Sequence, residues 1–196
     1  MIRSYKNLTL NVSEILRYAK TEGKELPKEA SAALDSLPET IMGRVVYEFY
    51  DIKETDGVID LGFTKTASKD LIKNLEGCGR IVLFAATAGI EFDMLIRRYE
   101  RVSPSKALWY QSIGSAYAES LCNAFCEEIK KEAGPAKPRF SPGYGDLPIE
   151  MQTDIFAALE CERNIGLTLG DNLFMTPSKS VTAIMGLIDQ TQKGKA

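Results

Sequence analysis

The sequence predicts an α+β fold in which a mainly antiparallel, twisted sheet is flanked by helices. Segments rich in β-branched and aromatic residues at 44–52 and 181–188 are typical of strands. A continuous apolar run at 80–86 indicates a central strand that is covered on both faces. Apolar residues that recur every three or four positions between 103 and 133 predict a long helix with a buried face.

The first two predicted elements are short helices whose starts carry capping signals. Asn11 or Ser13 can cap a helix that runs toward Gly23, because short polar side chains accept hydrogen bonds from the first free N–H groups of a helix. Pro27 can begin a second helix, which we expect to end before Pro38, since proline suits the first helical position.

The strand at 44–52 is followed by a turn signal, Thr55-Asp56-Gly57, and by a second strand at 58–62. We expect the two strands to form a hairpin, because Asp-Gly between two β-rich segments is a strong signal for one. Ser68 can cap a helix over 69–75. The central strand comes next and leads into a further helix.

Beyond the long helix, the pattern predicts a helix over 148–164 and two strands, at 171–175 and 181–188. The polar turn 176–180 lies between these strands, which could therefore close a hairpin. The tail from Gln190 to Ala196 is expected to be frayed.

Length and composition limit the classes of function. The chain has 196 residues, and we expect a single unit with an N-terminal part, 1–104, and a motif-bearing part, 105–190. The net charge of −3 argues against nucleic acid as the main partner, because phosphates are bound by clustered Lys and Arg. The sequence has no apolar run of the roughly 20 residues that cross a bilayer, and it begins without a signal-peptide core. We therefore expect a cytoplasmic protein without membrane contact.

The chain contains no histidine, which excludes Ser-His-Asp and Cys-His nucleophilic schemes and every His-ligated metal site. Of its four cysteines, Cys122 and Cys126 lie four residues apart on one face of the long helix. A pair at this spacing can begin an iron–sulfur motif, but a cluster needs four soft ligands and the sequence has no third cysteine close by. We expect small buried thiols and no bound metal.

The stretch from Arg139 to Pro148 carries the strongest functional signal. It holds two glycines and two prolines, so neither a helix nor a strand can continue through it. We expect an ordered loop whose backbone N–H and C=O groups are left free to bind a ligand. Arg139 lies at its start, and a planar guanidinium suits a carboxylate or a phosphate. On the residues alone, a helix-entry loop with an incidental arginine is an equal alternative.

The order Arg139, Pro142, Gly143, Tyr144 resembles a known loop, Arg-Pro-Ala-Pro-Gly-Tyr, with Ser141 where that loop has alanine. This is the S-adenosylmethionine loop of the activation domain of cobalamin-dependent methionine synthase. Further segments agree in the same order along the chain. They are the helix 118–127, which resembles the family's long helix before the loop, and the segments 166–169 and 175–181, which resemble its Gly-x-x-Leu-Thr and aromatic-Pro-x-x-Ser-Val segments.

The resemblance implies a site for S-adenosylmethionine. The implied cofactor-binding residues of the loop are Arg139, Ser141, Pro142, Gly143 and Tyr144. Arg139 would pair with the carboxylate of the ligand. Backbone groups near Ser141 and Gly143 would contact the adenine or the amino-acid part, and Tyr144 would hold the ligand through its backbone or its ring.

The ammonium group of such a ligand needs an acid. The family carries a glutamate at the position of Asn123, so the charge is missing there. We infer from charge alone that Asp146 or Glu119 could balance the ammonium. Asn123 itself is a weaker candidate for ligand contact, and so are Ser178 and Lys179 on the neighbouring predicted turn.

The resemblance also implies a role and partners. In the family, the activation domain supports the reductive methylation of cob(II)alamin, which restores a methionine synthase whose cobalamin has been oxidised. The chain starts at its own Met1, and a C-terminal extension of the family that supplies a further tyrosine is absent. We expect a separate subunit, rather than a complete enzyme, that docks on a corrinoid methionine synthase lacking its own activation domain. The partner would carry the cobalamin, and a flavodoxin- or ferredoxin-type protein would supply electrons.

Two alternatives stay open. The chain could be an independent S-adenosylmethionine-dependent methyltransferase, which would need a general base beside the loop. It could also be a non-catalytic scaffold that has lost the ligand, which the asparagine at position 123 makes conceivable.

Overall fold

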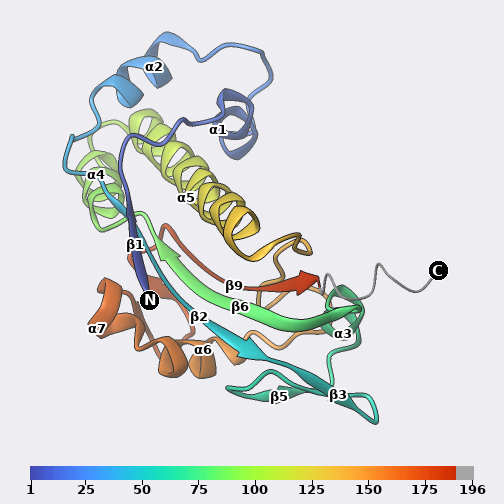
Figure 1. The fold of residues 1–196 in the computed structure, drawn as a ribbon. Helices are drawn as coiled ribbons and strands as arrows, with labels where there is room; N and C mark the ends of the chain where they lie inside the picture. Colours follow the sequence, from blue (N-terminus) through green and yellow to red (C-terminus); the bar gives the residue numbers. More distant parts are fainter. Residues whose placement is uncertain (189–196) are drawn as a thin grey trace.

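A four-stranded antiparallel sheet forms the centre of the molecule (Figure 1). The computed structural model describes residues 1–188, so the tail predicted to be frayed lies outside the described residues. In spatial order, the strands are β1 (Ile2–Tyr5), β2 (Gly43–Asp51), β6 (Cys78–Thr87) and β9 (Ser180–Ile188). The prediction of a central strand at 80–86 is confirmed, because β6 pairs with β2 along one edge and with β9 along the other.

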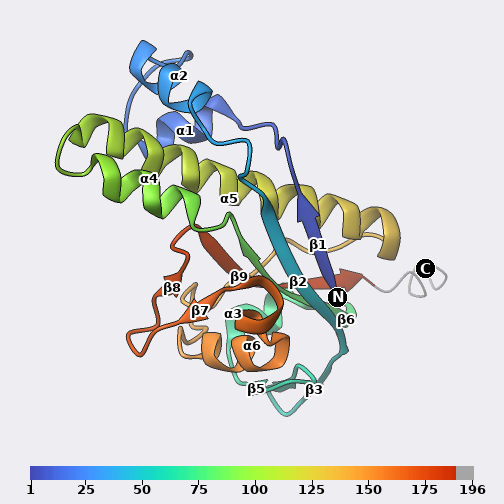
Figure 2. The same cartoon turned by 90° about the vertical axis from the view of Figure 1, so that its left-hand side faces the viewer.

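Helices cover both faces of this sheet (Figure 2). Successive side chains of a strand point to opposite faces, so β6 contributes to two cores. Val82 and Phe84 pack under α5 (Pro104–Ala133), whereas Ile81 and Leu83 pack against the opposite layer. That layer consists of α3 (Lys69–Asn74), α6 (Met151–Leu159) and α7 (Cys161–Ile165). The α+β architecture predicted from the sequence is therefore confirmed.

A third core joins the remaining helices to the N-terminal half of α5. These helices are α1 (Val12–Tyr18), α2 (Lys28–Asp35) and α4 (Glu91–Tyr99). Asn11 caps α1 by accepting a hydrogen bond from the N–H of Ser13, and Pro27 directly precedes α2, as predicted. The 30 residues of α5 extend over about 45 Å, which lets one helix pack on the sheet and on this helical cluster.

The predicted hairpin between 44–52 and 58–62 is wrong. The residues after the turn do form β4 (Val58–Asp60), but β4 pairs with the short β3 (Lys53–Thr55) and with β5 (Lys65–Thr66). β2 pairs instead with β6 and with β1, an N-terminal strand that we did not predict. The turn signal does form a hairpin, because Asp56 and Gly57 have positive φ and Thr55 pairs with Val58, but its strands are β3 and β4. Four of the nine residues of β2 are buried, whereas all three of β3 are exposed, so β2 belongs to the central sheet and the hairpin begins only after it.

Two predictions in the C-terminal part also need correction. The helix predicted over 148–164 is two helices, because Glu160 adopts the left-handed conformation with φ 45° between α6 and α7. The strand predicted over 171–175 shrinks to β8 (Met175–Thr176), which pairs with β7 (Thr168–Leu169) rather than with β9. Within residues 1–188, no helix combines the length and hydrophobicity needed to cross a membrane.

Candidate functional site

The chain segment that carries Arg139 runs antiparallel along the open edge of β9. The N–H of Lys137 donates to the carbonyl of Gly186 over 2.8 Å, and Phe140 and Ile184 exchange two hydrogen bonds of 2.8 Å. Because side chains alternate along an extended segment, Arg139 and Phe140 point in opposite directions. Phe140 packs into the core beneath α6, and Arg139 reaches toward α5.

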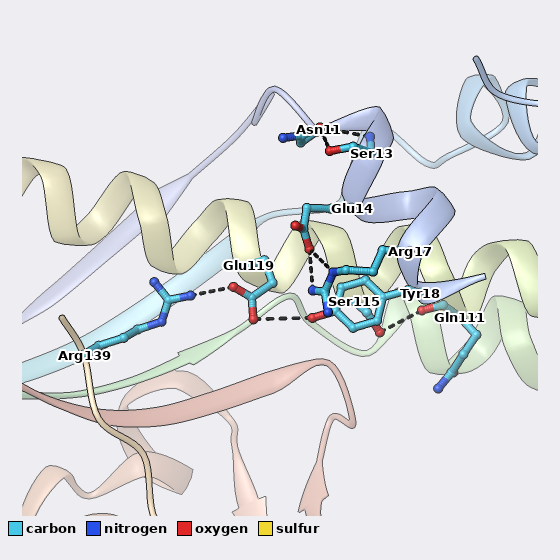
Figure 3. A network of polar contacts seen from close by, with 9 residues as sticks. All are labelled: Asn11, Ser13, Glu14, Arg17, Tyr18, Gln111, Ser115, Glu119 and Arg139. Atoms are coloured by element: carbon cyan, nitrogen blue, oxygen red, sulfur yellow. Dashed lines mark hydrogen bonds and ion pairs between the residues drawn. The ribbon is translucent and has the colours of Figure 1, made fainter. Parts of the chain in front are cut away.

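Two residues on successive turns of α5 hold the guanidinium of Arg139. Its Nη2 donates to Glu119 Oε2 over 2.5 Å and its Nη1 to Asn123 Oδ1 over 2.8 Å. Figure 3 shows that Tyr18 of α1 lies on the far side of Glu119, where its hydroxyl donates to Oε1 over 3.4 Å. These hydrogen bonds fix the position of the guanidinium. About a quarter of the Arg139 side chain stays exposed, so a ligand can still reach it.

The loop that follows Arg139 is closed by its own backbone. The N–H of Gly143 donates to the carbonyl of Leu147 over 2.9 Å, and the N–H of Tyr144 to the carbonyl of Ser141 over 3.2 Å. The expectation that these N–H groups are left free for a ligand is therefore wrong. Gly143 has φ 87°, which explains the glycine, and the side chain of Tyr144 is 68% exposed.

Asp146 lies at the N-terminus of α3. Its carboxylate accepts hydrogen bonds from the hydroxyl of Ser68 and from the backbone N–H groups of Lys69, at 2.8 Å, and Asp70, at 3.2 Å. The Ser68 hydroxyl, and then these N–H groups, lower the pKa of Asp146. This arrangement caps α3 and docks the loop on it, so the acid that we expected to balance an ammonium group fixes the loop instead.

Ser178 and Lys179 fasten the turn before β9 onto two helices. The N–H of Ser178 donates to Asp93 Oδ2 of α4 over 2.8 Å, and its hydroxyl donates to Asp93 Oδ1. Lys179 is 94% buried, and its Nζ donates to Ser115 Oγ of α5 over 3.2 Å. Burial lowers the pKa of Lys179. Both side chains serve the packing of this turn.

A groove of about 690 Å³ lies between α5, the segment 137–142 and β9. This volume lies within the range of small-molecule sites. The groove brings together Asn123, Arg139, Ser141, Pro142 and Tyr144 of the predicted site residues, together with Glu119. Among the residues that the structure describes, the lining does not include Gly143, Asp146, Ser178 or Lys179.

The groove also contains residues that sequence reasoning missed. Gln152 of α6 is 94% buried, and Met175, Val181 and Met185 add apolar surface. The sequence does carry a signal for Gln152, because this amide lies beside the apolar stripe of the predicted helix 148–164. A polar residue at such a position indicates a polar group that is directed at the interior.

Cys126 contributes to the groove, and Cys122 lies one turn before it on α5. Both thiols are buried, as predicted, and burial raises the pKa of Cys122 to about 12. A thiol with such a pKa stays protonated at neutral pH and is a poor nucleophile. The chemistry of the groove therefore rests on its charged and amide side chains.

These side chains can hold a zwitterion with an apolar body. Arg139 offers a cation, Glu119 offers an anion next to it, and Gln152 offers a neutral amide among apolar side chains. The two carboxylates among the groove residues that the structure describes are already in ion pairs, Glu119 with Arg139 and Glu127 with Lys130. Binding and orientation are what this arrangement can provide.

No family model matches the chain, and no curated protein matches it in sequence. Comparison with solved structures finds a crystal structure of the MetH reactivation domain bound to AdoHcy. The TM-score is 0.72 at 17% sequence identity, and the match covers 95% of this chain and 78% of that one. The chain has the fold of that reactivation domain.

Proposed function

We propose that this chain binds S-adenosylmethionine in the groove beside α5 and supports the reactivation of a cobalamin-dependent methionine synthase. The observation that carries the proposal is the partly exposed guanidinium of Arg139, held against an acid in a groove that the Arg-x-x-Pro-Gly-Tyr loop helps to form. The shared fold adds support, because the domain of similar structure was solved with AdoHcy.

The residues of the groove fit the ligand group by group. Arg139 would bind the carboxylate through its two-pronged guanidinium. Glu119 would take the ammonium, which leaves the acid paired when the ligand carboxylate competes for Arg139. Tyr144 has an exposed ring, and an aromatic face attracts a cationic sulfonium. Ser141 and Pro142 would form the floor next to the amino-acid part.

When bound, S-adenosylmethionine would supply the methyl group for the corrinoid of a partner protein. Reductive methylation of cob(II)alamin consumes this methyl group and one electron, which a flavodoxin- or ferredoxin-type protein would deliver. The partner would be a corrinoid methionine synthase that lacks its own activation domain. The residues of this chain would bind and orient the ligand, which is where its contribution to the rate would come from.

The experiment combines calorimetry with absorption spectroscopy of the corrinoid. S-adenosylmethionine is titrated into the chain, and the chain is then added to a methionine synthase in the cob(II)alamin state with a reducing partner. We expect binding, and conversion to methylcobalamin that depends on both the chain and the ligand.

Other outcomes would point elsewhere. Absence of binding would remove the proposal and favour a scaffold that has lost the ligand. Methyl transfer to a small acceptor without any corrinoid protein would favour an independent methyltransferase.

A further inference from the structure

The side chain of Gln152 has a buried hydrogen-bond acceptor without a partner. Gln152 lies in the first turn of α6, is 94% buried and contributes to the wall of the groove. Among the buried side-chain nitrogen and oxygen atoms of residues 1–188, two have no hydrogen-bond partner, Oε1 of Gln152 and Oδ1 of Asn74. Asn74 lines a different hollow, next to Tyr144 and Gly145.

A buried acceptor without a donor destabilises the folded state, so most such groups in folded proteins are paired. A leucine or methionine at position 152 would avoid this cost and extend the apolar part of the groove lining, which includes Met175, Val181 and Met185. The unpaired amide of Gln152 lies beside a groove. A ligand in this groove that supplies the missing hydrogen bonds would explain why the position holds an amide.

The charge distribution of the groove indicates which part of the ligand this is. The zwitterionic end is matched by Arg139 and Glu119 on the α5 side. A neutral amide carries one acceptor and one donor side by side. The edge of adenine presents the complementary pair, an exocyclic amino donor next to a ring-nitrogen acceptor, and glutamine pairs with this edge through two hydrogen bonds.

We propose that Gln152 reads the adenine edge of the bound nucleoside and makes the groove specific for adenine. This inference rests on the proposed function, because it names a specificity residue of the same site. Gln152 acts by binding and positioning and takes no part in bond making.

The test compares AdoHcy with an analogue whose purine carries hydrogen in place of the 6-amino group. Calorimetry is done on the wild type and on Gln152→Met, which keeps the length of the side chain and removes both hydrogen bonds. We expect the wild type to bind AdoHcy at least about tenfold more tightly than the analogue, because an unmade hydrogen bond leaves the amide unpaired. In Gln152→Met, the two ligands should bind within about twofold of each other.

A stability measurement separates this role from a structural one. In the free protein, Gln152→Met should leave the melting temperature unchanged or raise it, since it removes an unpaired buried acceptor. The rise in melting temperature on adding AdoHcy should shrink in the same variant. A matched control is Asn74→Leu, which removes the other unpartnered acceptor together with the hydrogen bond from Asn74 Nδ2 to the carbonyl of Pro138. Overall affinity can change in this variant, but the ratio of the two affinities should stay the same.

The outcomes distinguish the two proposals. If the wild type binds neither ligand, both the proposed function and this inference are wrong. If the wild type binds both ligands equally, or if Gln152→Met retains the discrimination, the inference alone is overturned. A large drop in the melting temperature of free Gln152→Met with unchanged discrimination would assign Gln152 to packing.

Discussion

The two walls of the groove differ in whether their polar side chains already have hydrogen-bond partners within the chain. On the α5 wall, Arg139, Glu119 and Asn123 already bind one another, with Tyr18 added behind them. On the opposite wall, the amide of Gln152 has an acceptor without a partner. A half-buried charge without a counter-ion destabilises a fold far more than a neutral amide without a hydrogen-bond partner. This explains why the charged groups are paired within the chain, whereas the amide of Gln152 is not.

This difference predicts how each wall contributes to affinity. A ligand carboxylate has to share or displace Glu119 at Arg139, so only part of that interaction appears as net binding free energy. The amide on the other wall breaks no hydrogen bond when a ligand arrives. The charged wall would then supply the anchor, and the neutral wall would supply the selectivity.

The largest change should follow from removal of the anchor on the charged wall. Arg139→Ala should weaken AdoHcy binding by about 100-fold, because the ligand carboxylate loses the cation that would bind it. Arg139→Lys is the matched variant. It keeps the charge without the fork, so we expect a smaller loss, of about tenfold. Calorimetry measures both, and equal affinities in all three proteins would refute the assignment of Arg139.

A second prediction disturbs the loop without touching either wall. Gly145 has φ 54°, and a Cβ there would overlap the carboxylate of Asp70. Gly145→Ala should lower the free energy of unfolding by about 2 kcal/mol, from backbone strain and displacement of Asp70 together. In the control Gly57→Ala, the φ is 77° and the space is open, so the loss should be about 1 kcal/mol. Urea unfolding checks this, and equal losses would argue against a docked loop.

A third prediction divides the charged wall into its two roles. Glu119→Gln should weaken AdoHcy binding by about tenfold, because the ammonium loses its counter-ion. An AdoHcy analogue without the α-amino group should not lose affinity in this variant, since its carboxylate no longer competes with Glu119 for Arg139. Calorimetry with both ligands tests the assignment, and parallel losses would show that Glu119 only positions the arginine.

The smallest effect on binding should come from Asp146. Its pKa in the folded protein lies below the usual value of 3.8, so the carboxylate stabilises the fold above that pH. The stabilisation should disappear as the pH falls through the lowered pKa. Asp146→Asn should therefore be less stable than the wild type at pH 7, and the difference should close below pH 3.8. Thermal unfolding against pH measures this. Ligand affinity should stay within about twofold, and a tenfold loss would return Asp146 to the binding site.

Sequence reasoning located the elements whose signals are local. Asn11 and Ser68 cap helices through contacts within three residues, and the apolar run at 80–86 needs cover on both faces wherever it lies. The strand β1 has only four residues, which is too short for a clear pattern, and its place depends on pairing with Val45 and Val46, more than forty residues away. Local patterns carry no information about such pairing.

The same limit applies to the candidate site. Arg139 was identified because its loop has a distinctive order of residues, and the groove beside it confirms that the side chain is accessible. The capping role of Asp146 depends on Ser68, and the contribution of Gln152 depends on how α6 packs beside the groove. Charge alone suggested the wrong environment for Asp146, because a carboxylate suits a helix N-terminus as well as it suits an ammonium group.

Residues 135–140, which lead into the loop, also protect the open edge of β9. The backbone of β9 would otherwise present a row of unsatisfied donors and acceptors to the solvent, and such an edge recruits strands from other molecules. Residues 135–140 cover it, with bonds from Lys137 to Gly186, between Phe140 and Ile184, and from Ile188 to Pro135. The segment that carries Arg139 should therefore also prevent association between copies of the chain through this edge. Substitutions that weaken the pairing of this segment with β9 should lower solubility as well as ligand affinity. We therefore expect residues 135–140 to tolerate few substitutions, even at positions that do not contact the ligand.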